Sequence, residues 1–148
     1  MVAAVEVMLS EFIAGPGQRK VTFPRLYPVP VQRVVEWVLE FTNTRIAEKV
    51  SLEEMAQISG VCRSHLCRLC MNHLGYAPVE LVYMYRLARS LYGLSVGQKI
   101  ESLANQMGFA SAAHYTRRFE GFFGKSPRQM RKALGKGYWP KLPDLPYM

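Results

Sequence analysis

The stretch LCRLCMNHLGYAP at residues 66–78 decides the fold, because its pattern returns 49 residues later as YTRRFEGFFGKSP at residues 115–127. Both copies keep an arginine at the third position, apolar residues at helical spacing, and a glycine and a proline near the end. Apolar residues three and four positions apart are typical of an amphipathic helix, and glycine ends helices because it adopts positive φ without strain. The repeat predicts one helix in each copy.

The similarity extends upstream of both helices. Residues 52–61 and 100–109 match at five positions with an offset of 48 residues, so the second copy has one extra residue before its longer helix. The matched pairs are Leu52 with Ile100, Met55 with Leu103, Ala56 with Ala104, Gly60 with Gly108, and Val61 with Phe109. A short helix, a turn containing glycine and a second helix form the helix-turn-helix shape. The chain is therefore predicted to hold two helix-turn-helix units.

Further helices are predicted around these units by the same apolar spacing. They span about residues 31–50, 79–92 and 126–134. Ser51 and Glu54 match the capping-box pattern that starts a helix, Ile58 is expected on the buried side of that helix, and Gly93 is expected to break the helix before it. The predicted fold class is all-α, with about seven helices and two helix-turn-helix subdomains joined by a linker helix.

The first 30 residues differ in character from the rest. Apolar residues fall on one helical face at Val5, Met8, Leu9, Phe12 and Ile13. Residues 15–30 are rich in glycine and proline and predict a linker. So short a helix is unstable alone, and we expect it to dock on this domain, a second copy or a further domain. The predicted organisation is an N-terminal amphipathic helix and linker at 1–30, a double helix-turn-helix domain at 31–134 (first unit 31–78, linker helix 79–93, second unit 96–134) and an irregular tail at 135–148.

The positive charge of the chain is concentrated in its second half. The 148 residues carry a formal net charge of +8, to which residues 75–134 contribute nine basic and three acidic side chains. Residues 31–74 hold five of each and are neutral overall. This distribution indicates an anionic partner, although from charge alone nucleic acid binding and a generally basic soluble surface both remain open.

Several classes of protein are disfavoured. The first residues lack a basic region ahead of their apolar run, and no stretch approaches the roughly 20 apolar residues of a membrane span. We therefore expect a cytoplasmic protein with no membrane partner. No nucleophilic triad, carboxylate pair or phosphate-binding loop is present, so neither an enzymatic activity nor a cofactor is predicted.

The cysteines invite a second interpretation. Cys62, Cys67 and Cys70 lie within nine residues, too close in sequence to link distant parts of a secreted fold by disulfide bonds. A reducing compartment is therefore predicted. Cys67, Cys70 and His73 have a spacing that could suggest a metal or redox site. Because Cys70 is expected inward and Cys67 outward, ordinary packing without a metal is favoured, and a thiol- or metal-responsive regulator is kept as an alternative.

A family resemblance covers about residues 31–134. It rests on Gly75, on Arg86-Leu87-Ala88-Arg89-Ser90, on Ile100 with Leu103, Ala104, Gly108 and Phe109, on Tyr115, Arg117 and Phe119, and on Phe123-Gly124-Lys125-Ser126-Pro127. With these residues the chain resembles the DNA-binding domain of the AraC/XylS family of bacterial transcription regulators. The resemblance implies a rigid linker helix and two recognition helices placed in successive major-groove turns of double-stranded DNA.

The resemblance also implies site residues, position by position. The candidates for base reading are Ser64, Cys67 and Arg68 in the first unit, and Ala112, Ala113, Thr116 and Arg117 in the second. Arg63 and His114 are expected to contact phosphates or base edges. Arg68 and Arg117 occupy equivalent positions in the repeat, and arginine forms a bidentate pair with guanine in the major groove.

The expected partners follow from the same resemblance. They are double-stranded DNA, RNA polymerase, and an effector-binding or dimerisation domain, of which residues 1–30 resemble the end. A helical protein-interaction module is the alternative from another class.

Two further expectations concern packing. Arg86 and Arg89 on the linker helix are expected to pair with Glu80 or with helix carbonyls, giving at least one of them a structural role. Cys70 stands where the second copy has Phe119, so the first recognition helix is expected to be the less firmly packed of the two.

Overall fold

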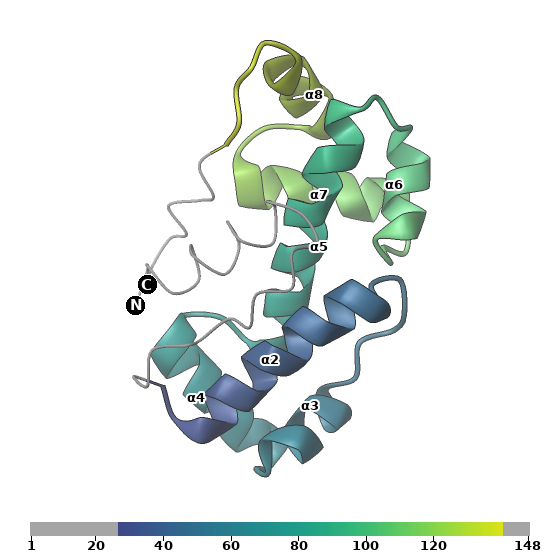
Figure 1. The fold of residues 1–148 in the computed structure, drawn as a ribbon. Coiled ribbons are helices and arrows are strands. Elements are labelled where there is room, and N and C mark those ends of the chain that lie inside the picture. The colour runs from purple at the N-terminus through teal and green to yellow at the C-terminus, as the bar shows by residue number, and fades with distance from the viewer. Residues whose placement is uncertain (1–26, 141–148) are drawn as a thin grey trace.

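The computed structural model describes residues 27–140, which form seven α-helices and no strands (Figure 1). The helices are α2 (Val29–Thr44), α3 (Leu52–Ser59), α4 (Arg63–Leu74), α5 (Pro78–Ser95), α6 (Ile100–Gln106), α7 (Ala112–Phe123) and α8 (Pro127–Gly135). The predicted all-α class and number of helices are confirmed for this part of the chain. The helix predicted at residues 5–13 and the end of the tail lie outside the described residues.

Helix α5 joins two groups of helices. Figure 1 shows α2, α3 and α4 around one end of α5 and α6, α7 and α8 around the other. Each group has its own apolar core, and α5 contributes to both. Its side chains in the first core include Leu81, Val82, Met84, Tyr85 and Ala88. Its side chains in the second core are Leu87, Leu91 and Leu94. We call the two groups, without α5, the first unit and the second unit.

Glycines end both second helices of the helix-turn-helix pairs. Gly75 after α4 has φ 79° and Gly124 after α7 has φ 69°, a left-handed conformation that favours glycine. Serines begin several helices: the Oγ of Ser111 accepts from the N–H of His114, and Ser126 forms a full capping box with Gln129. The glycine ends of α4 and α7 therefore agree with the repeat pattern.

Three expectations about helix positions were wrong. Helix α2 begins at Val29, inside the predicted linker, and ends at Thr44, earlier than predicted. Helix α5 continues through Gly93 to Ser95. A Cβ at Gly93 would lie 2.2 Å from Leu103 Cδ2, so the glycine permits close packing of α6 instead of breaking α5. Ile58 is 48 % exposed, and Ser59 takes the buried position, donating a hydrogen bond to the Met55 carbonyl.

The capping box predicted at the start of α3 is only half formed. The Ser51 Oγ accepts a hydrogen bond from the Glu54 N–H at 3.2 Å, as expected. The Glu54 carboxylate turns away from the helix start and accepts hydrogen bonds from Arg45 and Trp37 instead. A charge-assisted bond to a guanidinium outweighs a bond to a neutral N–H at the same helix end.

Candidate nucleic-acid interface

Helix α4 presents a polar face away from the first core. Ser64 and Arg68 are exposed and Cys67 is half-buried, while Leu66, Cys70 and Leu74 are buried on the opposite side. Two basic side chains on this face have neighbours: Arg63 pairs with Glu53 (Nε–Oε2 3.4 Å), and Arg68 Nη2 lies 3.4 Å from His65 Nδ1. Both contacts are at the surface and contribute little to stability, so these arginines can exchange them for another partner.

Helix α7 presents the equivalent face in the second unit. Ala113 and Arg117 are exposed and Thr116 is half-buried. Arg117 makes no hydrogen bond or ion pair with any residue that the structure describes. Because its position in α7 matches that of Arg68 in α4, both units offer one guanidinium from the same place on the second helix.

Two of the predicted site residues lie closer to the second core than expected. Ala112, a predicted base-reading residue, is half-buried and packs against the second core. The His114 ring makes edge contacts with Tyr83 and Phe109, at centroid distances of 5.9 and 5.6 Å. Its Nδ1 is buried without a hydrogen-bond partner in the described part of the chain. The face of α7 that is open to a ligand therefore centres on Ala113, Thr116 and Arg117.

An aromatic chain supports α7 from behind. The ring centroids of Phe109 and Tyr115 are 5.2 Å apart, those of Tyr115 and Phe119 5.6 Å, and those of Phe119 and Phe123 4.5 Å. The Tyr115 hydroxyl lies 2.8 Å from the Ser90 hydroxyl of α5. Burial raises the pKa of Tyr115 to about 12. These contacts fix the rotation of α7 relative to α5.

Helix α4 is supported differently. Cys70, its counterpart of Phe119, is fully buried beneath the long helix α2, whose Val34, Val38 and Phe41 fill the same core. Cys70 has no exposed surface, so the smaller residue leaves no opening to solvent at this place. Whether it leaves α4 less firmly packed than α7 stays a prediction. Burial raises the pKa of the Cys70 thiol to about 12, with the nearby Cys67 as a smaller cause.

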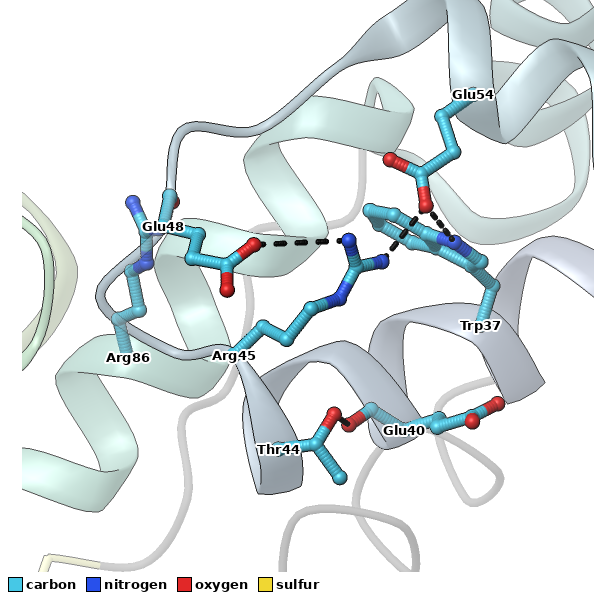
Figure 2. A network of polar contacts seen from close by, with 7 residues as sticks. All are labelled: Trp37, Glu40, Thr44, Arg45, Glu48, Glu54 and Arg86. Carbon is cyan, nitrogen blue, oxygen red and sulfur yellow. Dashed lines mark hydrogen bonds and ion pairs between the residues drawn. The ribbon is translucent and has the colours of Figure 1, made fainter.

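Sequence reasoning missed a polar network that holds α3 against α2 (Figure 2). Glu54 accepts hydrogen bonds from Arg45 Nη2 at 2.6 Å and Trp37 Nε1 at 3.3 Å, and Arg45 also pairs with Glu48 at 3.6 Å. The hydrogen bond from Arg45 lowers the pKa of Glu54, opposed in part by burial. Trp37 shares the apolar face of α2 with Val34 and Phe41, a spacing that could have revealed its burial but not its polar partner.

Both linker-helix arginines have structural roles, where a role for at least one was expected. Arg86 is buried and donates hydrogen bonds to three carbonyl oxygens, and Arg89 donates to the Thr42 carbonyl at 2.5 Å. Burial lowers the pKa of both groups. Glu80, which was considered as their partner, instead accepts two hydrogen bonds from Arg118, whose guanidinium lies 4.4 Å from the Tyr83 ring centroid.

The cysteines are not arranged as a cluster. Cys62 is exposed, Cys67 half-buried and Cys70 buried, and all three are free thiols. Within residues 27–140, no group of three or more histidine, cysteine or acidic side chains is placed to hold a metal ion. In the same part of the chain, no helix has the length and apolar character needed to cross a membrane.

The architecture and the paired exposed faces define a protein with two helix-turn-helix units. A helix-turn-helix domain family matches residues 55–133, which is more than half of the chain. The chain belongs to the AraC/XylS family of helix-turn-helix transcription regulators.

Several characterised proteins are similar to it. The transcriptional regulator GlxA of Rhizobium meliloti is 33 % identical over 100 residues, covering 66 % of this chain and 31 % of the relative. The lactose operon transcription activator of Staphylococcus xylosus is 26 % identical over 113 residues, covering 74 % and 40 % respectively. The chain thus spans less than half the length of these relatives.

Solved structures have the same fold. An AraC-type DNA-binding domain protein from Chromobacterium violaceum aligns with TM-score 0.63 and 24 % identity, over 75 % of this chain and 100 % of that one. The DNA-binding domain of the global transcriptional factor AdpA, solved with a target DNA, aligns with TM-score 0.62 and 23 % identity over 74 % of this chain and 96 % of that one.

Proposed function

We propose that the protein is a sequence-specific regulator of transcription that binds double-stranded DNA with α4 and α7 in successive turns of the major groove. One observation supports this most directly: two 12-residue helices, each second in a helix-turn-helix, expose an arginine at the equivalent position. The major groove is wide enough for an α-helix, and arginine is the commonest reader of guanine there. The solved complex of AdpA with DNA adds support from a similar fold.

The proposed roles differ between the units. Arg68 and Arg117 read base edges, with Ser64 and Cys67 beside the first and Ala113 and Thr116 beside the second. Methyl groups of Ala113 and Thr116 suit contact with thymine. Arg63, at the exposed start of α4, contacts phosphate.

Ala112 and His114 are proposed to contribute less to DNA contact than the exposed residues of α7. Both are half-buried against the second core, so they contact DNA only through the edge of each side chain that remains open. Their main effect on binding is to hold α7 at its proper depth over Phe109.

The second unit supplies most of the electrostatic attraction to phosphate. Lys125, Arg128 and Lys132 are exposed around the start of α8 and along it, in addition to Arg117 on α7. The first unit has as many acidic as basic residues. Each phosphate contact releases counterions, so affinity should fall steeply with salt, and substitutions in the second unit should reduce that slope most.

The wider biology is proposed from the family. The relatives are much longer than this chain, and we propose that it works with an effector-binding or dimerisation domain and acts on RNA polymerase at bacterial promoters in the cytoplasm. No catalytic step is proposed, since members of a DNA-binding regulator family act by binding.

Selection of bound duplexes from a random pool tests the proposal. The expected result is an enriched motif with two boxes about one helical turn apart, bound less tightly as salt rises. Absence of any enriched motif, with retained binding to a protein partner, would favour the protein-interaction module. Footprinting of the selected duplex should show protection of two consecutive major-groove faces on one side of the DNA.

A further inference from the structure

Arg86 links the two units through a single side chain. It lies on α5 and is 2 % exposed. Its Nε donates to the Ile46 carbonyl at 2.9 Å and its Nη2 to the Glu48 carbonyl at 2.6 Å, both in the loop between α2 and α3. Its Nη1 donates to the Gly108 carbonyl at 3.3 Å, in the turn between α6 and α7. One guanidinium thus holds a loop of the first unit and a turn of the second.

The loop and the turn touch each other around this side chain. Gly108 has φ +77°, and a Cβ there would lie 2.8 Å from the Ile46 carbonyl oxygen and 2.9 Å from Arg86 Cζ. Any residue other than glycine would be strained in this conformation and would push the two segments apart. The first and second units therefore meet at a tight joint formed by Ile46, Arg86 and Gly108.

Few other direct contacts join the two units, which otherwise both pack on α5. Within residues 27–140 the two apolar cores are separate, and every extensive packing of helices lies within one unit or involves α5. The half-buried Phe122 packs against both cores. Helix α5 also has directed contacts with each unit separately, from Arg89 to the Thr42 carbonyl in the first and from Arg118 to Glu80 in the second. The hydrogen bonds of Arg86 differ because they reach both units at once, and those of a planar guanidinium have fixed directions.

We propose that Arg86 is a positioning residue for DNA recognition, which sets the angle and the spacing between α4 and α7. This inference rests on the proposed function. Gly108 lies in the turn that leads into α7, and Ile46 and Glu48 lie in the loop before α3, which packs against α4. A rigid connection of this kind makes DNA affinity depend on the spacing between the two boxes, which are the DNA segments that α4 and α7 bind.

Spacing of the boxes gives the first test. Inserting one base pair between them rotates the second box by about 35° and moves it by about 3.4 Å, since a turn holds about 10 base pairs. The full-length wild-type chain should lose affinity on the order of tenfold or more for the longer duplex, as for a mismatched box. Arg86→Met should bind the native spacing more weakly, yet lose less than about threefold on insertion, because its units adjust separately.

Control variants separate positioning from general destabilisation. Ser59→Ala removes a buried hydrogen bond within α3 of the first unit, away from the loop that Arg86 contacts, and should keep the wild-type spacing penalty. Arg86→Lys keeps the positive charge but has one ammonium in place of the fork, and should show an intermediate penalty. A wild-type spacing penalty in both Arg86 variants, whatever their absolute affinity, would overturn the proposal.

A distance measurement without DNA gives the second test. Asn72 and Gly121 are exposed and equivalent in the repeat, and a Cβ at Gly121 meets nothing within 4 Å. Spin labels on Asn72→Cys and Gly121→Cys, with Cys62 and Cys67 changed to Ser, should give a narrow distance distribution that broadens when Arg86→Met or Arg86→Lys is added. An unchanged distance distribution would reject the positioning role of Arg86. This result does not depend on DNA, so it is distinguishable from failure of the proposed function, which would appear as the absence of a selected DNA motif.

Discussion

The first and second units have the same helix-turn-helix shape but reach it by different interactions. In the second unit, a chain of rings from Phe109 to Phe123 fills the space behind α7. In the first unit, the residue in that place is Cys70, and α2 covers α4 from outside. The comparison teaches that one helix-turn-helix shape can be built over an aromatic core and over a core with a small residue at the equivalent place.

The two units also differ in charge and in how their recognition helices begin. The first is neutral, whereas residues 75–134 carry a surplus of six positive charges. Helix α7 has a Ser111 cap, but Cys62 before α4 makes no side-chain cap hydrogen bond. The start of α7 therefore has a side-chain cap that the start of α4 lacks, whereas the polar network of Arg45, Glu54 and Trp37 belongs to the first unit.

Removal of the buried residue behind each recognition helix should have the largest effect. Phe119→Ala should lower the free energy of unfolding by about 3–5 kcal/mol, because a fully buried ring leaves a cavity. Cys70→Ala removes one buried sulfur atom and should cost only about 1 kcal/mol. Urea denaturation followed by circular dichroism measures both losses of stability. Equal losses would show that Phe119 contributes no more to the second core than Cys70 does to the first.

The two exposed arginines should differ in which bases they affect. Arg68→Ala and Arg117→Ala should each relax discrimination by about 1–3 kcal/mol at one position, with the two positions about one helical turn apart. Selection followed by affinity measurements on single-base variants provides the readout. Uniform weakening at every position would instead identify that arginine as a phosphate contact.

The caps offer a matched pair with smaller effects. Ser111→Ala removes the hydrogen bond to the His114 N–H and should cost about 1 kcal/mol of stability. Cys62→Ser adds a cap where the first unit lacks one and should stabilise by up to about 1 kcal/mol. Thermal unfolding of both variants beside the wild type checks the signs, and a destabilised Cys62→Ser would show that the α4 start cannot adopt the capped geometry.

The smallest effect is expected at Glu54, which is specific to the first unit. Its pKa is lowered in the folded state, so its stabilising contribution is present above the pKa of the unfolded carboxyl and is lost as pH falls through the folded value. Glu54→Gln should cost less than about 1 kcal/mol at neutral pH, since the pair is partly exposed. Unfolding curves from neutral to acidic pH should converge for variant and wild type, and a constant difference down to low pH would contradict this assignment.

Most of the helices could be predicted from the sequence because their signals are local. The repeat and its terminal glycines placed α4 and α7, and the helical pattern at residues 126–134 placed α8, within a residue or two. The prediction at Gly93 failed because this glycine lies inside α5, where its lack of a side chain allows Leu103 of α6 to approach closely. The packing of α2 over Cys70 was also out of reach, since nothing in the repeat says which element covers it.

The candidate site was predictable in outline for the same reason. The repeat places Arg68 and Arg117 on equivalent exposed positions, which the structure bears out in burial. The half-buried state of Ala112 and His114 depends on Phe109 and Tyr83, which approach from a turn and from α5. Whether the named residues contact DNA stays a prediction.

The hydrogen bonds of Arg86 also bear on how the chain unfolds. Its acceptors lie 40 and 38 residues before it and 22 residues after it, so they come together only when both units are in place. If one unit melted alone, a buried cation would lose part of its shell of carbonyls, which raises the free energy of that half-folded species. The two units should consequently unfold in one cooperative transition, with a single denaturant slope for the pair.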